Sequence, residues 1–241
     1  MRCAGALEHD GTIAGVPHLA ANGPDSWIWW EWVGDHLDEI QTRLTEHVEL
    51  TALAVLFGLL LAFPLAFLSF RYRRLYPPVL FVTGALYAIP SLALFGLLIP
   101  ITGLSTATAL VPLTLYTLLI LVRNIVTGLD GVSPEVRDAA AGVGYARRRQ
   151  LREVELPLAL PAIIAGIRIA TVTTIGLVTV TALVGQGGLG RLIVDGYTRD
   201  FKTPTVVGTV LSIALAVTVD LALLLVQRIA TPWDRAGRTR T

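Results

Sequence analysis

Residues 48–70 read VELTALAVLFGLLLAFPLAFLSF, in which Glu49 is the one charged residue. About 20 such residues in a helix cross the apolar core of a bilayer. Four further runs of this kind follow, and the five predicted spans cover 48–70, 79–100, 105–122, 161–184 and 204–227. We therefore predict an all-α membrane protein with five transmembrane helices. A β-barrel is excluded, because its strands would alternate apolar and polar residues.

The composition excludes several classes of protein. Hydrophobic residues make up 54% of the 241 positions and charged residues 15%, against about 25% charged residues in an ordinary soluble domain. A soluble enzyme is therefore excluded as the default, and a net charge of +1 gives no reason to expect a nucleic-acid partner. The lone lysine, Lys202, follows Phe201 instead of a glycine, so the sequence has no ATP-binding P-loop. The histidines lack zinc-type spacing, and we predict no catalytic residue, metal or cofactor.

The distribution of basic residues predicts the orientation. With five spans, the amino terminus and the loops around 101–104 and 185–203 share one side of the membrane, and that side carries five basic residues. The opposite side carries thirteen, and Arg168 lies within a span. Cytoplasmic loops of membrane proteins are enriched in Arg and Lys. We therefore predict an amino terminus outside the cytoplasm and a cytoplasmic carboxyl terminus.

The segment before the first span carries an aromatic cluster, with four of the five tryptophans inside 27–32. Tryptophan prefers the membrane–water interface, and apolar residues recur at intervals of three and four over 27–47. These features predict an amphipathic helix that lies along the membrane surface, with a disordered polar tail as the alternative. We accordingly divide the chain into an extracytoplasmic segment (1–47), a transmembrane domain (48–230) and a cytoplasmic tail (231–241).

The longest predicted loop, 123–160, joins the third and fourth spans on the cytoplasmic side and has helix signals of its own. Ser133-Pro134-Glu135 combines an N-cap residue, a proline at the first helical position and an acid in the first turn. We predict a short helix from this point, a break at Gly144, where glycine accepts unusual backbone angles, and a second, basic helix over 146–153. Leu156-Pro157 is expected to turn the chain back into the membrane.

This loop resembles the E-A-A motif of ABC importer permeases. The pattern reads E-A-A, three residues, G, nine residues, I, one residue, L-P. The chain matches that spacing throughout, with aspartate for glutamate and valine for isoleucine, at Asp138, Ala139, Ala140, Gly144, Val154, Leu156 and Pro157. Residues 88–100, 121–129 and 185–193 are similar to stretches of permeases for glycine betaine, choline and carnitine. The chain therefore resembles the osmoprotectant type of binding-protein-dependent (type I) importer.

The resemblance implies a multi-pass permease subunit in the plasma membrane of a prokaryote, surrounded by membrane lipid. Two permease subunits would form the pore, as a homodimer or a heterodimer, and an external binding protein would deliver the solute. Two cytoplasmic ATPase subunits would drive transport, so that the permease itself catalyses no reaction. The resemblance also implies that the two-helix coupling loop, 134–153, sits in a groove of the ATPase and transmits its closure to the pore.

Three alternatives stay open from the sequence. A permease for an amino acid such as methionine shares the motif and a five-span core. A stand-alone channel or secondary transporter fits the spans but leaves the E-A-A loop without a role. A structural scaffold would tolerate a bulky replacement of Gly144.

Two charges fall inside predicted spans, Arg168 in the fourth and Asp220 in the fifth. Each charge costs roughly 2.5–3.5 kcal/mol on insertion scales, and the two have similar depths and opposite signs. We predict an intramembrane ion pair between these spans that serves packing. The alternative is that Arg168 reaches the headgroups while Asp220 faces an aqueous cavity.

The candidates for lining the pore lie around the proline in the second span and on the third span. They are Tyr87, Pro90, Ser91 and Tyr116, with packing as the alternative role of each. A quaternary amine is usually held by an aromatic cage. Because the spans contain few aromatic residues, we assign high-affinity selection of the solute to the external binding protein.

Overall fold

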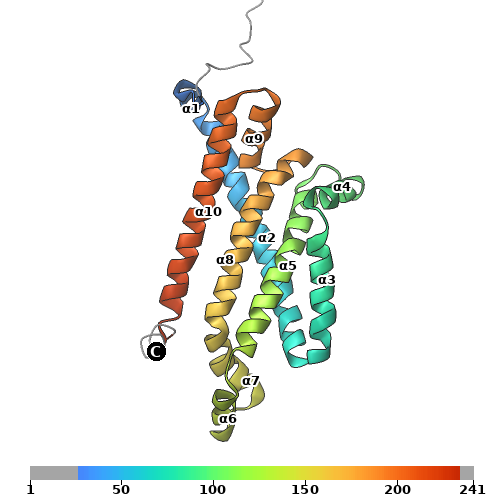
Figure 1. Ribbon diagram of the computed structural model, residues 1–241, viewed down its shortest axis with the longest axis vertical. Coiled ribbons are helices and arrows are strands. Elements are labelled where there is room, and N and C mark those ends of the chain that lie inside the picture. The colour runs from blue at the N-terminus through green and yellow to red at the C-terminus, as the bar shows by residue number, and fades with distance from the viewer. Residues whose placement is uncertain (1–26, 234–241) are drawn as a thin grey trace, which may run out of the picture.

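The computed structural model describes residues 27–233, and every regular element within this range is a helix. Four helices are long and apolar enough to cross a membrane, and a bent pair makes a fifth candidate. The four extend along the long axis of the molecule (Figure 1); they are α2 (Leu37–Arg71), α5 (Thr106–Asp130), α8 (Leu156–Val180) and α10 (Lys202–Ala230). The predicted all-α fold is confirmed, with four to five candidate spans.

The predicted second span is divided into α3 (Tyr76–Ala88) and α4 (Ser91–Thr102), which meet at an angle of 89°. Pro90 causes the break, because proline has no N–H to donate and disfavours a helical residue before it. Ile89 accordingly has an extended backbone. The short 3-10 helix η1 (Arg73–Leu75) joins α2 to α3. In Figure 1, α2 ends at the lower end of the molecule and α5 begins at the upper end, so α3 and α4 together carry the chain between them.

Helix α5 forms the centre of the bundle, between α2 and α8. Its buried face supplies a large part of the core, including Leu121, Ile125 and Leu129, none of which is more than 1% exposed. Glycines bring the helices close together: a Cβ placed at Gly166 of α8 would collide with the side chain of Asn124 on α5, and one at Gly128 would lie 2.9 Å from the Ala159 carbonyl oxygen. Small residues at such contacts are typical of membrane helix packing.

The amino-terminal segment differs from the single surface helix predicted over 27–47. The structure has a short helix, α1 (Trp30–Asp35), and α2 begins directly after His36. The remainder of the predicted surface helix is therefore the first part of α2. Trp29 and Trp32 pack their ring edges against Phe201, and the backbone N–H of Trp29 donates to Thr203 Oγ1 at 2.9 Å. These contacts fasten the segment to the start of α10. Residues 1–26, and 234–241 of the predicted tail, lie outside the described residues.

Two predicted loops contain more helix than expected. The segment after the fourth span includes the helix α9 (Leu189–Thr198), preceded by the 3-10 turn η3 (Thr181–Val184). The glycine-rich stretch before α9 gave no helix signal in the sequence. On the other side, α5 does not stop at Arg123 but continues to Asp130. A charge in a helix is compatible with water beyond the membrane surface, so the end of an apolar run does not mark the end of a helix.

A larger side chain at the contact between α5 and α8 should destabilise the bundle. We expect Gly166→Leu to cost about 1–3 kcal/mol of unfolding free energy, because the added atoms overlap Asn124. Gly176→Leu, on the same helix, is the control, since a Cβ there meets nothing within 4 Å. Thermal unfolding of the detergent-purified protein measures both. Equal melting temperatures for the two variants would contradict this account of the packing.

Candidate functional site

The predicted coupling loop begins with the helix α6 (Pro134–Gly142), which projects from the lower end of the bundle (Figure 1). Ser133 caps it by accepting a hydrogen bond from the backbone N–H of Val136 at 3.4 Å. The backbone N–H of Glu135 and, secondly, the Ser133 hydroxyl stabilise the Glu135 carboxylate and hold its pKa below the usual value. The sequence prediction of a helix beginning here agrees with the structure.

The end of α6 is a Schellman motif, in which the residue after the cap is left-handed. Gly144 takes that position with φ of +87°. The backbone N–H of Gly144 donates to the Ala141 carbonyl at 3.0 Å, and that of Tyr145 donates to the Ala140 carbonyl at 3.1 Å. Glycine adopts this conformation without the penalty that a Cβ would bring. Gly144 therefore ends α6 sharply and leaves its tip exposed.

The residues of the E-A-A pattern differ in their exposure to solvent. Asp138, Ala139 and Gly144 are exposed, whereas Ala140 is 7% exposed and packs inside the chain. Of the two alanines in the pattern, only Ala139 is therefore available for contact with a partner, with Asp138 and Gly144 beside it. The remaining positions, Val154, Leu156 and Pro157, are half-buried.

The second predicted helix of the loop is not a separate element. The structure has α7 (Arg147–Gln150), a π-helical turn, η2 (Leu151–Glu155), and then α8 without interruption, so the chain is continuously helical over Arg147–Val184. The turn predicted at Leu156-Pro157 is wrong. Pro157 has no N–H to donate, and the wider π-turn before it carries the helix through this position.

Arg137 and Glu155 fasten α6 to the bundle, and neither residue was predicted from the sequence as part of the site. Arg137 Nη2 donates to the Leu129 carbonyl at 2.6 Å, and Arg137 Nε lies 3.8 Å from Glu155 Oε2. The guanidinium also lies 5.6 Å from the ring centroid of Phe70 on α2. Glu155 is 6% exposed and accepts a hydrogen bond from Gln150 at 3.0 Å. The position of the charged Glu155 among the apolar residues of the motif is the sequence feature that could have identified it.

The bend between α3 and α4 gathers the pore candidates. The Tyr116 hydroxyl donates to the Ile89 carbonyl at 2.7 Å, and the Tyr87 ring packs edge-on against Tyr116 with centroids 5.8 Å apart. Tyr116 is only 4% exposed. It satisfies a carbonyl that the proline break leaves without a helical partner. Pro90 and Tyr87 are exposed and Ser91 is half-buried, so these three remain available to line a path.

Arg168 and Asp220 form a bidentate ion pair between α8 and α10. Arg168 Nε donates to Asp220 Oδ1 at 2.9 Å, and Nη2 donates to Oδ2 at 2.8 Å. Gln227 supports the pair from the next turns of α10. It accepts from Arg168 Nη1 at 3.2 Å and donates to the Pro161 carbonyl, also at 3.2 Å.

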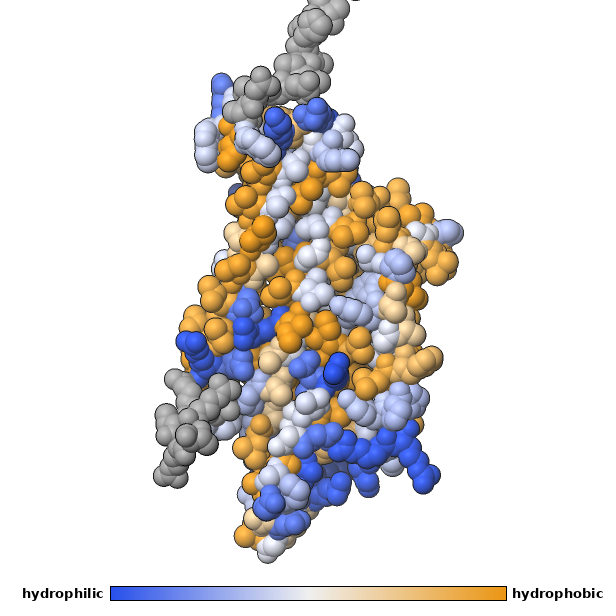
Figure 2. All heavy atoms as spheres, viewed as in Figure 1, coloured by the Kyte–Doolittle hydropathy of each residue, from blue (hydrophilic) through white to orange (hydrophobic). Residues whose placement is uncertain are grey.

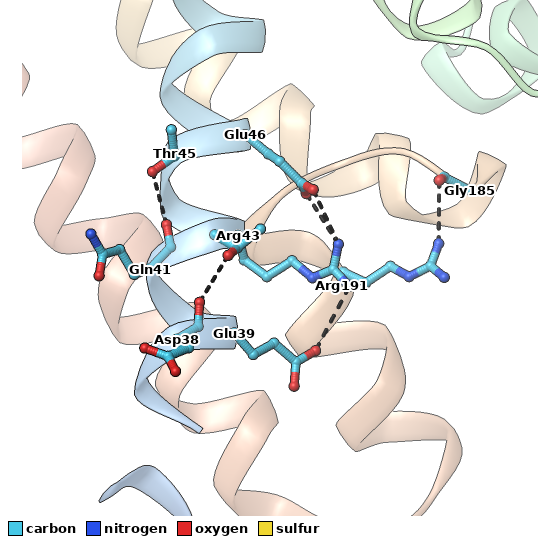
Figure 3. Close-up of polar contacts among 9 residues, drawn as sticks. Asp38, Glu39, Gln41, Arg43, Thr45, Glu46, Gly185 and Arg191 are labelled. Carbon is cyan, nitrogen blue, oxygen red and sulfur yellow. Dashed lines mark hydrogen bonds and ion pairs between the residues drawn. The ribbon is translucent and has the colours of Figure 1, made fainter. Parts of the chain in front are cut away.

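The opposite end of the molecule contains a polar cavity of about 230 Å³ between α2 and the glycine-rich turn 185–188. Figure 3 shows Arg43 directed toward Glu46 and Glu39 of its own helix, and Arg191 Nη1 donates to the Gly185 carbonyl at 3.2 Å. Gly188, at φ +46°, lies against the backbone of Arg43 and His47, where a Cβ would clash at 2.6 Å. The glycine-rich turn is therefore tightly packed against α2.

Comparison with known proteins decides the family. The family of "Binding-protein-dependent transport system inner membrane component" matches residues 54–230. This chain belongs to that family. As an inner membrane component of an ABC importer, it is a permease subunit, and its apolar helices are those of a membrane-spanning protein.

Similar proteins include permeases for osmoprotectants. The osmoprotectant import permease protein OsmW of Salmonella typhimurium is 38% identical over 82% of this chain and 94% of its own length. The choline transport system permease protein OpuBB of Bacillus subtilis is 34% identical over 80% of this chain and 89% of its own length. The glycine betaine/carnitine/choline permease OpuCB, also of Bacillus subtilis, is 33% identical over 83% of this chain and 92% of its own length. The predicted resemblance to osmoprotectant permeases is confirmed.

Solved structures share the fold. A chain of the inward-facing MetNI methionine ABC transporter has a TM-score of 0.72 at 22% identity, covering 82% of this chain and 98% of that chain. A chain of an amino acid ABC transporter with histidines has a TM-score of 0.70 at 17% identity, covering 83% and 98%. This likeness shows that the permease has the importer fold.

The bend should depend on the Tyr116 hydroxyl. We expect Tyr116→Phe to lower the unfolding free energy by about 0.5–1.5 kcal/mol, because the Ile89 carbonyl loses its donor. Tyr87→Phe is the matched control, since the structure gives Tyr87 a ring contact alone. Thermal unfolding in detergent compares them. A larger loss in the Tyr87 variant would mean that the hydroxyl of Tyr116 does not hold the bend.

Proposed function

We propose that this chain is the transmembrane permease subunit of an ATP-driven importer that takes up a quaternary-amine osmoprotectant, such as glycine betaine, choline or carnitine. Support comes from the relatives named for these solutes, which are 33–38% identical over most of their length. The permease catalyses no covalent reaction. It provides a path that opens alternately to the two sides of the membrane.

The proposed topology has five spans, with the amino terminus outside and the carboxyl terminus in the cytoplasm. Because α2 ends and α5 begins at opposite ends of the molecule (Figure 1), the bent pair α3 and α4 acts as a broken span and not as a re-entrant loop. Figure 2 shows hydrophilic side chains gathered at the lower end, where α6 and α7 lie. This end includes Arg147, Arg148 and Arg149, and a basic end is characteristic of the cytoplasmic side.

The proposed coupling site is the exposed tip of α6. The exposure of this tip is the main observation that supports the coupling mechanism. Asp138, Ala139 and Gly144 present small or acidic groups to a partner, here a groove of a cytoplasmic ATPase. The link from Arg137 to Glu155 passes any displacement of α6 to the base of α8. ATP binding would then favour one of two arrangements of the bundle through its different contacts with α6 in each.

The remaining partners follow from the same proposal. A second permease subunit, identical or paralogous, completes the pore, and an external binding protein delivers the solute. Tyr87, Pro90 and Ser91 at the bend are proposed to line the path, whereas Tyr116 supports it from behind.

A methionine-type importer is the nearest alternative. Its structural support is the 0.72 TM-score to the methionine transporter, but the identity there is 22%. The higher identity to osmoprotectant permeases favours a quaternary amine. Uptake of radiolabelled glycine betaine, choline and methionine by proteoliposomes that contain the complete transporter separates the two functions.

The coupling proposal predicts that a charge at Ala139 uncouples the ATPase. We expect Ala139→Glu to lower solute-stimulated ATP hydrolysis more than about tenfold, since an unpaired charge buried at an interface costs about 3–5 kcal/mol. Ala141→Glu, an exposed position on another face of the same helix, is the control and should keep most of the stimulation. Membrane insertion of both variants is checked by their yield after detergent extraction. Full stimulation in Ala139→Glu would refute docking through this face.

A further inference from the structure

A cleft of about 530 Å³ lies between α8 and α10, and the ion pair forms part of its wall. Arg168, Asp220 and Thr173 supply its polar groups, and the remaining lining is aliphatic, as at Val172, Val217 and Leu221. The side chains of Arg168 and Asp220 are 22% and 36% exposed. Both charges are therefore accessible from the cleft although they are paired with each other.

The depth of the pair in the helix bundle indicates that the cleft holds water. Arg168 lies seven residues inside the predicted span 161–184, and Asp220 lies seven residues inside 204–227, so about 10 Å of helix separates each charge from the nearer end of its span. Charged side chains at that depth face a bundle interior or an aqueous cavity, because exposure to lipid is costly. Figure 2 shows hydrophilic side chains between α10 and α8 that continue to the lower end of α10, with apolar surface above them.

The contacts that hold Arg168 in place leave the pair able to bind a solute. Gln227 fixes the Arg168 guanidinium through Nη1, and Gln227 is itself fixed by the Pro161 carbonyl. Arg168 can therefore keep its orientation while its contact with Asp220 is exchanged. A planar guanidinium binds a carboxylate through two parallel hydrogen bonds, as it binds Asp220 here.

We propose that the cleft between α8 and α10 is a transit site for a small zwitterion that carries both a carboxylate and a cationic ammonium. The solute carboxylate takes the place of Asp220 at Arg168, and the solute ammonium lies beside the Asp220 carboxylate. One internal ion pair is replaced by two, so no charge is left unpaired. This assignment rests on the proposed function and narrows its solute class from quaternary amines in general to zwitterionic ones.

The residues that line the cleft favour weak binding and release of a solute over tight retention. A quaternary ammonium has no N–H, so Asp220 attracts it by charge alone while its methyl groups contact aliphatic side chains such as Val172 and Leu221. Strong retention of such a cation generally uses an aromatic cage, and no aromatic residue is among those lining this cleft in the described part of the chain. Weak binding allows the solute to leave toward the cytoplasm.

Transport by the complete reconstituted importer tests the charge recognition. For Arg168→Gln we expect the rate of glycine betaine uptake to fall about tenfold or more, because its carboxylate loses its partner. Choline has no carboxylate, so we expect its rate of uptake to stay within about twofold of the wild type. Asp220→Asn should lower the uptake of both solutes. Arg73→Gln breaks a different ion pair, with Asp130 at the base of α5, and should not change the preference between the solutes.

The outcomes separate this proposal from the proposed function. If the wild type takes up neither solute, both the proposed function and this proposal are overturned. If the wild type takes up choline alone, only this proposal is overturned. An equal loss of both solutes in Arg168→Gln shows a purely structural pair and also overturns it. If the wild type takes up glycine betaine alone, or if Arg168→Gln does not assemble, the two solutes cannot be compared in this variant. Thiol labelling of the cleft then tests the proposal.

Labelling uses a Cys3→Ser background, since Cys3 is the one native cysteine. Thr173→Cys places a thiol in the cleft, and Ala222→Cys places one at an exposed position on the opposite face of α10. We expect a charged, membrane-impermeant methanethiosulfonate to modify Thr173→Cys faster than Ala222→Cys, and glycine betaine, unlike choline, to slow the reaction at Thr173→Cys. An unreactive Thr173→Cys would indicate a lipid-filled or subunit-covered groove, and a reaction that glycine betaine does not slow would exclude the solute. Either result overturns the proposal.

Discussion

The close approach of α8 and α2 to α5 is the constraint on which the arrangement of this bundle depends. In a bilayer, apolar side chains gain little by leaving lipid for a neighbouring helix, so packing contacts between small residues hold helices together. The contact of Gly166 with Asn124 and that of Gly128 with Ala159 provide this packing on both sides of the α5–α8 crossing. They place α8 where its base meets α6 and its middle meets α10.

Two polar links then connect this packed centre to α6 and α10. Arg137 joins the tip helix α6 to the end of α5 and to Glu155. Arg168 joins the middle of α8 to α10. Helix α10 has no buried residue in its most apolar window, and it packs against α8 and α9, with the ion pair as one contact on the α8 side. The permease thus combines a packed core with a peripheral helix.

The sequence located most of the long helices and one contact between them, the Arg168–Asp220 pair, but not the other contacts. Apolar runs located α2, α5, α8 and α10, and the Ser133-Pro134-Glu135 signal located α6, because both depend on local chemistry. The continuity of α7 with α8 was missed because Pro157 suggested a turn, and only the geometry shows the π-turn that accommodates it. Helix α9 was missed because glycines precede it. Arg137 and Glu155 could not be paired from sequence, since their link depends on how α6 folds back on the bundle.

The uninterrupted helix over Arg147–Val184 has a mechanical consequence. At 1.5 Å per residue it is a rod about 57 Å long, and its contact with Asn124 at Gly166 lies near its midpoint. If the helix pivots at this contact, a sideways push at its α7 end swings its far tip in the opposite direction. That tip leads into the glycine turn wedged against α2 at Arg43 and His47. Opening on one face and sealing on the other would then be a single movement.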